Sequence, residues 1–207
     1  STIYKKNISF QKQIILMLDE FAHRLTKLTT DWIRVGYCQG NFNSDNCLAS
    51  GRTMDYGPFG FIEKFEPLWN MWVDGGKHFA FIPQKEAGYE NFKSFTNAIL
   101  PLLNNKYCNK AKEILMKYKN ILRQKMNDMW RKKLGFTNWN PKTDNQIISS
   151  LLTLLEKSKA DYTMFWRQLS DILFIINSHN IKEIIKDNET IIFYEPLTIE
   201  LKNIWFK

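Results

Sequence analysis

Apolar residues near the start of the chain recur every three or four positions, and this spacing predicts a long helix over residues 8–34. Its buried stripe would consist of Ile14, Leu18, Phe21, Leu25, Leu28 and Trp32. Gly36 and Gly40 follow and would end the helix. A chain of 207 residues that is 44% hydrophobic can bury one sizeable core, so this helix is expected to belong to a packed domain.

Helical spacing returns after residue 88 and continues through most of the remaining chain. It predicts helices over residues 89–104, 109–134, 145–157 and 161–177, a weaker one near 181–186, and a last one that is unfinished at residue 207. We expect Gly135 to cap the end of the second helix, Thr143 or Asp144 to cap the start of the third, and Asp161 to open the fourth.

The segment between the first helix and the later ones has a different character. Glycine and turn-forming residues over 35–65 predict loops with short strands in the runs VGYCQ, CLA and TMDYG, and residues 66–88 are expected to be irregular. No run of 18 or more apolar residues is present, so no membrane-spanning segment is predicted. The sequence therefore predicts a mainly α fold with a small β-hairpin region.

The net charge of +8 is compatible with an anionic partner or simply with solvated, lysine-rich helices. We favour the second interpretation for the basic residues of 109–134, because few aromatic side chains accompany them and nucleic-acid surfaces usually interleave the two. Cys38, Cys47 and Cys108 have spacings that fit neither a zinc site nor a disulfide framework. Such cysteine usage is typical of a reducing compartment.

The residues best suited to chemistry lie in one short stretch, NFNSDNCLASGRTMDYGPFGF, residues 41–61. Asp45, Asn46 and Asp55 are its strong oxygen ligands, and Mg²⁺ prefers oxygen ligands supplied by one or two carboxylates together with phosphates. We expect Asn46 and Asp55 to bind Mg²⁺, with Mn²⁺ as an alternative. Asp45 would accept a proton from an attacking hydroxyl. Each residue alone would be an ordinary turn residue, and the three in this order favour the functional interpretation.

The same order of residues occurs in the phosphate chemistry of protein kinases. When the kinase catalytic-loop pattern is laid over QGNFNSDN, residues 39–46, its final Asn falls on Asn46, its His on Gln39 and its catalytic Asp on Asn41. Asp55 then begins the Asp-Tyr-Gly sequence where kinases have Asp-Phe-Gly. We therefore expect a protein-kinase-like C-lobe whose β-hairpin region carries the metal and catalytic loop. Ordinary phosphotransfer is disfavoured because the usual kinase base is replaced at Asn41.

The run VGYCQGNFNSDNCLASGRTMDYGPFGFIEKFEP resembles the selenoprotein O family of kinase-like protein adenylyltransferases. That family reads approximately V-G-F-x-H-G-V-x-N-T-D-N, followed by G-x-T-x-D-Y-G-P-F/Y-G-F. KHFAFIPQKEAGYENFKSF, MWRKKLGF and LLTLLEKSKADYTMFWRQLS resemble later family segments in the same order. The first motif is specific and the others support it, and together they cover residues 20–177.

The resemblance implies a definite activity. Family members bind ATP inverted relative to protein kinases, transfer AMP to hydroxyl side chains of proteins and release pyrophosphate. By position, Asp45 would be the proton acceptor, Asn46 and Asp55 would bind Mg²⁺, and Asp55 would also lie against the ATP phosphates. The chain departs from the motif at Gln39, where the family has histidine, and at Asn41, where it has a small apolar residue.

The family's glycine-rich loop and phosphate-holding lysine and arginine belong to an N-terminal lobe that residues 1–19 do not resemble. We therefore interpret residues 1–207 as a single partial domain, the C-lobe, without the N-terminal lobe or the family's C-terminal end, and expect it to be inactive alone. The resemblance alone suggests a mitochondrial location. A catalytically dead pseudokinase scaffold is the alternative, disfavoured because a scaffold need not keep a metal site. A basic nucleic-acid-binding domain is the weakest candidate.

Overall fold

The computed structural model describes residues 8–54, 59–72 and 76–178, with the backbone alone for residues 171–178. Its helices are α1 (Phe10–Val35), α2 (Gln84–Ile99), α3 (Asn105–Lys133), α4 (Asp144–Ser158) and α5 (Tyr162–Ser178), with short 3-10 turns η2 (Ser44–Asn46), η3 (Lys77–Phe79) and η4 (Leu100–Leu102). Strands β1 (Tyr37–Cys38) and β2 (Gly60–Phe61) form a two-stranded antiparallel sheet. This confirms the expected mainly α class. The comparison with a kinase C-lobe remains a prediction.

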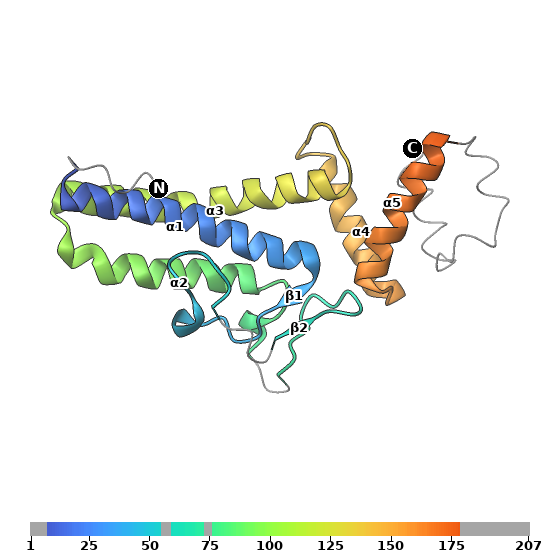
Figure 1. The fold of residues 1–207 in the computed structure, drawn as a ribbon, viewed down its shortest axis with the longest axis horizontal. Helices are drawn as coiled ribbons and strands as arrows, with labels where there is room; N and C mark the ends of the chain where they lie inside the picture. Colours follow the sequence, from blue (N-terminus) through green and yellow to red (C-terminus); the bar gives the residue numbers. More distant parts are fainter. Residues whose placement is uncertain (1–7, 55–58, 73–75, 179–207) are drawn as a thin grey trace.

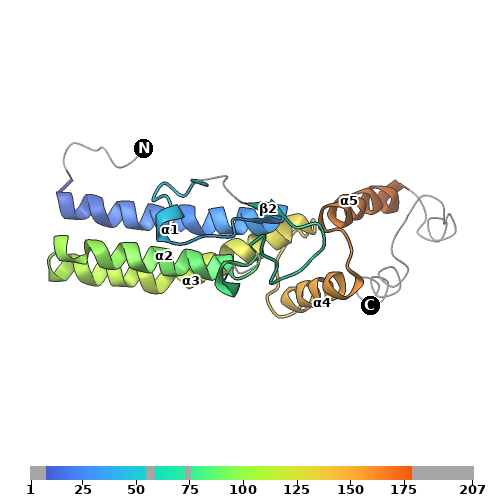
Figure 2. The same ribbon diagram turned by 90° about the horizontal axis from the view of Figure 1, so that it is seen from below.

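Helices α1, α2 and α3 form the long part of the molecule (Figure 1). They lie side by side in both views, with α2 running opposite to α1 and α3 (Figures 1 and 2). The predicted stripe of α1 is buried here, apart from the half-buried Leu28. Against it pack Phe92 of α2 and Tyr118 of α3, whose rings stack at 5.0 Å between centroids. Burial of these large rings supplies much of the apolar contact in this core.

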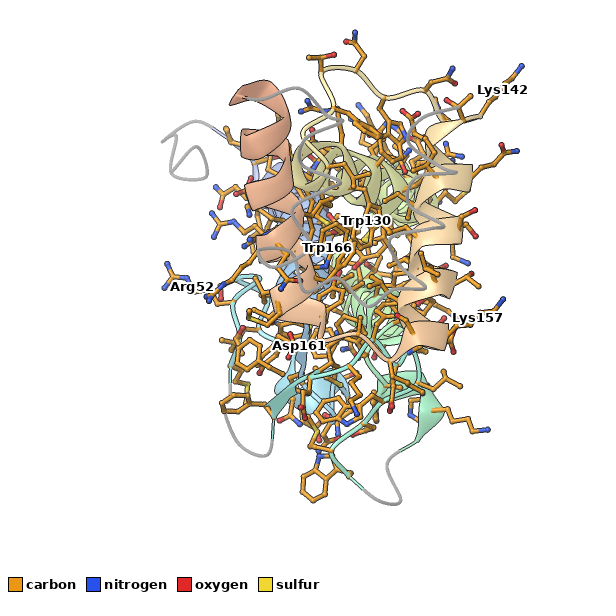
Figure 3. All side chains as sticks on the ribbon, turned by 90° about the vertical axis from the view of Figure 1, so that its right-hand side faces the viewer. Arg52, Trp130, Lys142, Lys157, Asp161 and Trp166 are labelled. Carbon is orange, nitrogen blue, oxygen red and sulfur yellow. The ribbon has the colours of Figure 1, made fainter. Side chains whose placement is uncertain are left out.

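A second core forms where α4 and α5 pack against the end of α3. Trp130 and Trp166 lie next to each other there, with ring centroids 5.8 Å apart (Figure 3). Helix α3 is closed by Gly135, two residues beyond Lys133, and the φ of this glycine, 72°, is left-handed. The N–H groups of Gly135 and Phe136 donate to the Lys132 and Arg131 carbonyls, which is the hydrogen-bond pattern of a Schellman cap. The predicted C-terminal cap of α3 is thus confirmed.

Asp161 opens α5 as predicted, because its Oδ1 accepts the backbone N–H of Met164 at 2.7 Å. The Tyr162 hydroxyl donates to the carbonyl of Ile33 at 3.0 Å, which ties α5 to the last turn of α1. Gly36 follows with a φ of 79°, and a Cβ there would lie 3.1 Å from both Ile62 and Tyr162. The chain can turn from α1 into β1 at this point because residue 36 is glycine.

Several predicted boundaries differ from the structure. Helix α2 begins at Gln84 rather than residue 89, and α3 begins at Asn105 rather than residue 109, because the Asn104 side chain accepts the Tyr107 N–H. The predicted strand VGYCQ shortens to β1. Within the described residues of CLA and TMDYG, which exclude 55–57, the strand pairing is one isolated bridge between Cys47 and Thr53. The helices predicted near 181–186 and at the end of the chain lie outside the described residues.

No helix within the described part of the chain is both long and apolar enough to span a membrane.

Candidate functional site

The loop that follows β1 is held by a buried glutamine at the start of α2. Gln84 is fully buried, and its Nε2 donates to the carbonyls of Tyr37 and Phe81, at 2.8 Å each. Its Oε1 accepts the backbone N–H of Gln39 at 3.2 Å. One side chain therefore joins β1, the start of the loop and the turn before α2, which fixes the direction in which the loop leaves the sheet.

Gln39 occupies the position at which the selenoprotein O motif has histidine, and its side chain is buried. Its Oε1 accepts the backbone N–H of Asn41 at 3.0 Å. The Gln39 side chain therefore holds the loop backbone two residues further along the chain, at Asn41. A histidine with an unprotonated ring nitrogen could accept the same type of bond, so Gln39 can give the loop a support that a histidine could also give.

Asn91 of α2 supports the middle of the loop. Its Nδ2 donates to the carbonyl of Phe42 at 2.9 Å and to that of Asn43 at 3.4 Å, and its Oδ1 accepts the Ser44 hydroxyl at 3.3 Å. Phe42 is buried against Trp32 of α1, with centroids 4.8 Å apart. The loop thus rests on two helices just before the residues of interest.

Asp45 and Asn46 both belong to the 3-10 turn η2. The Asn43 side chain caps this turn by accepting the Asn46 backbone N–H at 3.3 Å. The Nδ2 of Asn46 donates to the Asn41 carbonyl at 2.8 Å, so its Oδ1 is the atom that can serve a metal. Asp45 is exposed to solvent, which suits a carboxylate that exchanges a proton with a substrate.

Asp55, the other proposed metal ligand, lies outside the described residues. The structure therefore places Asp45 and Asn46 side by side and does not place Asp55. In the ranges that it does describe, no group of three or more His, Cys, Asp and Glu residues could hold a metal ion. A site made of Asn46, one aspartate and nucleotide phosphates contains only one residue of these four types, so it would not count as such a group. Its ligands are nevertheless the oxygen ligands that Mg²⁺ prefers. The donor chemistry of Asn46 fits this ion.

The segment that returns from η2 toward Asp55 is anchored on α1. Trp32 Nε1 donates to the Thr53 hydroxyl at 3.1 Å, and an Arg24 guanidinium nitrogen donates to the Ser50 carbonyl at 3.4 Å. Gly51 has a φ of 65°, and a Cβ there would come within 2.4 Å of the Arg24 Cβ. Glycine is required at this point both by the backbone angle and by the close approach of the helix. Arg52, next along the chain, extends outward (Figure 3).

Cys47 directly follows η2, and its thiol is not suited to act as a nucleophile. Burial raises its pKa to about 11, and the hydrogen bond with Asn91 offsets this only in part. The thiol is therefore protonated at neutral pH, whereas nucleophilic cysteines need the thiolate. This leaves the oxygen ligands as the chemistry of the loop.

Comparison with known proteins decides the family. A family model described as "Protein adenylyltransferase SelO" matches residues 1–207. The chain belongs to the SelO family. SelO is the family whose motifs the loop resembles, so the resemblance read from the sequence is confirmed.

Curated relatives agree with the family match. The chain is 31% identical over 161 residues to the protein nucleotidyltransferase YdiU of Rhodopirellula baltica, covering 77% of the chain and 29% of the relative. YdiU of Variovorax paradoxus is 32% identical, with coverages of 82% and 34%, and YdiU of Nitrosococcus oceani is 35% identical, with coverages of 74% and 32%. The chain thus spans about a third of the length of these SelO relatives.

Proposed function

We propose that this chain is the part of a SelO-type protein adenylyltransferase that carries the proton acceptor and a metal ligand. The complete protein would transfer AMP from ATP to the hydroxyl of a Ser, Thr or Tyr side chain of another protein. The observation that carries this proposal is η2, where exposed Asp45 and half-buried Asn46 lie together on a loop braced by three buried amide residues, Gln39, Gln84 and Asn91.

The reaction assigns one task to Asp45. The acceptor hydroxyl oxygen forms a bond to the α-phosphorus of ATP, the bond from that phosphorus to the bridging oxygen breaks, and pyrophosphate leaves. Asp45 takes the hydroxyl proton as the new bond forms. Solvent exposure of the carboxylate allows an acceptor side chain to reach it and allows the proton to pass on to water.

Asn46 and Asp55 are the proposed Mg²⁺ ligands, and Asp55 would also lie against the ATP phosphates. When bound, the ion supplies positive charge next to the phosphate oxygens, where negative charge builds up during transfer. The hydrogen bond from Asn46 Nδ2 to the Asn41 carbonyl holds the amide so that only its oxygen can face the ion. Loss of that bond would leave the amide free to turn its nitrogen toward the metal.

Transfer of label from ATP tests the proposed reaction. The complete protein is incubated with ATP labelled on either the α- or the γ-phosphate, together with acceptor proteins and Mg²⁺. We expect the α-label to enter protein, the γ-label to leave as pyrophosphate, and the Asp45→Asn variant to lose the α-label transfer. Transfer of the γ-label to protein would identify a kinase and overturn the proposal. The absence of both labels, together with retained protein binding, would favour the pseudokinase scaffold.

We also propose that residues 1–207 alone do not transfer nucleotide, because they form one partial, kinase-like domain without the family's phosphate-holding lobe. Removal of such contacts commonly lowers phosphate-transfer rates by about 10²-fold or more. Robust α-label transfer by residues 1–207 would contradict this. The family resemblance further suggests a mitochondrial location for the complete protein, which fluorescence microscopy of a tagged copy would test.

A further inference from the structure

A groove of about 720 Å³ runs from the loop that carries Asp45 to the middle of α3. This volume lies within the range of ligand pockets. Its walls come from the loop, η3, the first half of α2 and one face of α3, and α2 and α3 lie side by side in Figure 2. Its apolar lining residues are Phe42, Phe79, Ala87, Tyr89, Leu122 and Met126.

The groove is continuous with the proposed catalytic loop. Asn43 and Ser44 line one end of it, and Ser44 directly precedes Asp45 in η2. An extended chain advances about 3.3 Å per residue. If a peptide segment is bound in the groove, a side chain only a few residues along from the bound part would therefore lie near Asp45.

On the rim of the groove, within the part of the chain that the structure describes, the acidic side chains form ion pairs, whereas two of the basic side chains do not. Its two glutamates already have cation partners: Glu86 lies 3.2 Å from Lys85, and Glu90 lies 3.1 Å from Lys93. Lys119 lies over the Tyr89 ring at 4.7 Å, and Arg123 is exposed one helical turn further along α3. Among the described residues no carboxylate pairs with Lys119 or Arg123. The α3 side of the groove is therefore a rim of two cations above an apolar floor.

We propose that this groove docks an acidic segment of the acceptor protein, with an apolar anchor side chain on the floor and carboxylates against Lys119 and Arg123. The inference rests on the proposed function, since it names the class of acceptor that the site favours. Apolar contact alone would accept many sequences, and the unpaired cations supply the selectivity for acidic ones. The acceptor hydroxyl lies on the segment beside the anchor, at the Ser44 end of the groove.

Peptide binding tests the groove separately from the reaction. The probe is a fluorescein-labelled 15-residue peptide containing one serine, one leucine and several glutamates, and the control peptide has lysine in place of each glutamate. Fluorescence anisotropy is measured with the complete protein carrying Asp45→Ala, so that no turnover occurs. We expect the acidic peptide to bind more tightly than the lysine peptide, and the difference to shrink with added salt.

Matched charge reversals locate the binding. The double variant Lys119→Glu, Arg123→Glu changes the rim, and Lys106→Glu, Lys117→Glu makes the same charge change at exposed positions of α3 outside the groove. We expect the rim variant to weaken acidic-peptide binding about tenfold and the control less than twofold. Arg123→Glu alone, which leaves the Lys119–Tyr89 contact in place, should weaken binding about threefold and guards against misfolding of the double variant.

The outcomes separate this inference from the proposed reaction. Equal weakening by both double variants, or equal binding of the acidic and lysine peptides, would overturn the docking groove whatever the protein catalyses. The α-label transfer to the acidic peptide is measured with the complete protein in which Asp45 is intact. The rim variant of this protein should have a KM for the peptide about tenfold higher than the protein without the rim substitutions, at unchanged kcat. If peptide binding follows the predictions while no α-label is transferred to any acceptor, the groove stands and the adenylyltransferase proposal fails.

Discussion

Gln84→Met is the most informative change to the support of the candidate site. Methionine matches glutamine in length and shape and fits the same buried space, but it has neither the amide donor nor the strong acceptor. The change removes three hydrogen bonds: two from Nε2, to the Tyr37 and Phe81 carbonyls, and one from the Gln39 N–H to Oε1. A buried hydrogen bond contributes about 0.5–1.5 kcal/mol, so the expected loss of unfolding free energy is about 1.5–4.5 kcal/mol.

Urea unfolding followed by tryptophan fluorescence measures this loss. Gln124→Met, the same substitution at an exposed position of α3, is the matched control and should change the unfolding free energy by less than about 0.5 kcal/mol. Hydrogen exchange adds a local readout, because the amides of Gln39 and Asn41 should exchange faster in the Gln84 variant. If the two variants unfold at the same urea concentration and exchange at those amides is unchanged, Gln84 does not support the loop.

Three further predictions concern the rest of the domain. Burial, reinforced by the nearby Arg34 charge, lowers the pKa of Lys133 to about 7. Above that pH the unfolded chain binds one proton more than the folded chain, so the unfolding free energy should rise from about pH 7 to pH 10. This rise should vanish in Lys133→Met. Tyr162→Phe removes the bond to the Ile33 carbonyl and should cost about 1 kcal/mol in urea unfolding; an unchanged midpoint would show that the bond is not needed. Phe61 and Leu68 are 57% and 58% exposed, so residues 1–207 should bind a hydrophobic dye, and replacing both with serine should reduce this binding more than Met116→Ser; equal reductions would show that these two side chains are not the dye site.

Helices that depend on local pattern were predictable from the sequence. The stripe in α1 follows the helical period from Ile14 to Trp32, about five turns, and the caps at Gly135 and Asp161 act within a few residues of the helix ends that they close. Each of these features is encoded by neighbours along the chain. The existence of α1, α3, α4 and α5, and most of their ends, therefore follows from periodicity and capping alone.

The support of the site was not predictable in this way. Gln84 bonds to Gln39, which lies 45 positions earlier in the chain, and Asn91 bonds to Phe42, which lies 49 positions earlier. No local sequence pattern therefore indicates these contacts. The segment around them, FIPQKEAG, looks irregular because a proline precedes the helix and Gly88 lies within it, and the start of α2 was missed for that reason. A glutamine and an asparagine in the first half of a helix could have suggested a polar support, but their burial, which gives them that role, is visible only in the folded chain.

The site residues illustrate the same division. Asp45 and Asn46 were singled out by their ligand chemistry, and the structure places them together in η2. The sequence did not reveal that the Asn46 amide is oriented by the Asn41 carbonyl, or that the groove beside Ser44 carries a cationic rim. Both depend on how α2 and α3 approach the loop, which is a property of the folded chain.

Metal-dependent ATP titration, measured beside α-label transfer for Asp45→Ala and Asp55→Ala in the complete protein, tests the roles proposed for these two carboxylates. Asp55→Ala should sharply reduce metal-dependent ATP binding, because the proposed metal site would lose its carboxylate ligand. Asn46→Ala should do the same more mildly. Asp45→Ala should leave ATP binding nearly intact and lower transfer by roughly 10²- to 10⁴-fold, as expected for a general base. Equal loss of ATP binding in the Asp45 and Asp55 variants would contradict the division of roles, since both carboxylates would then hold the metal.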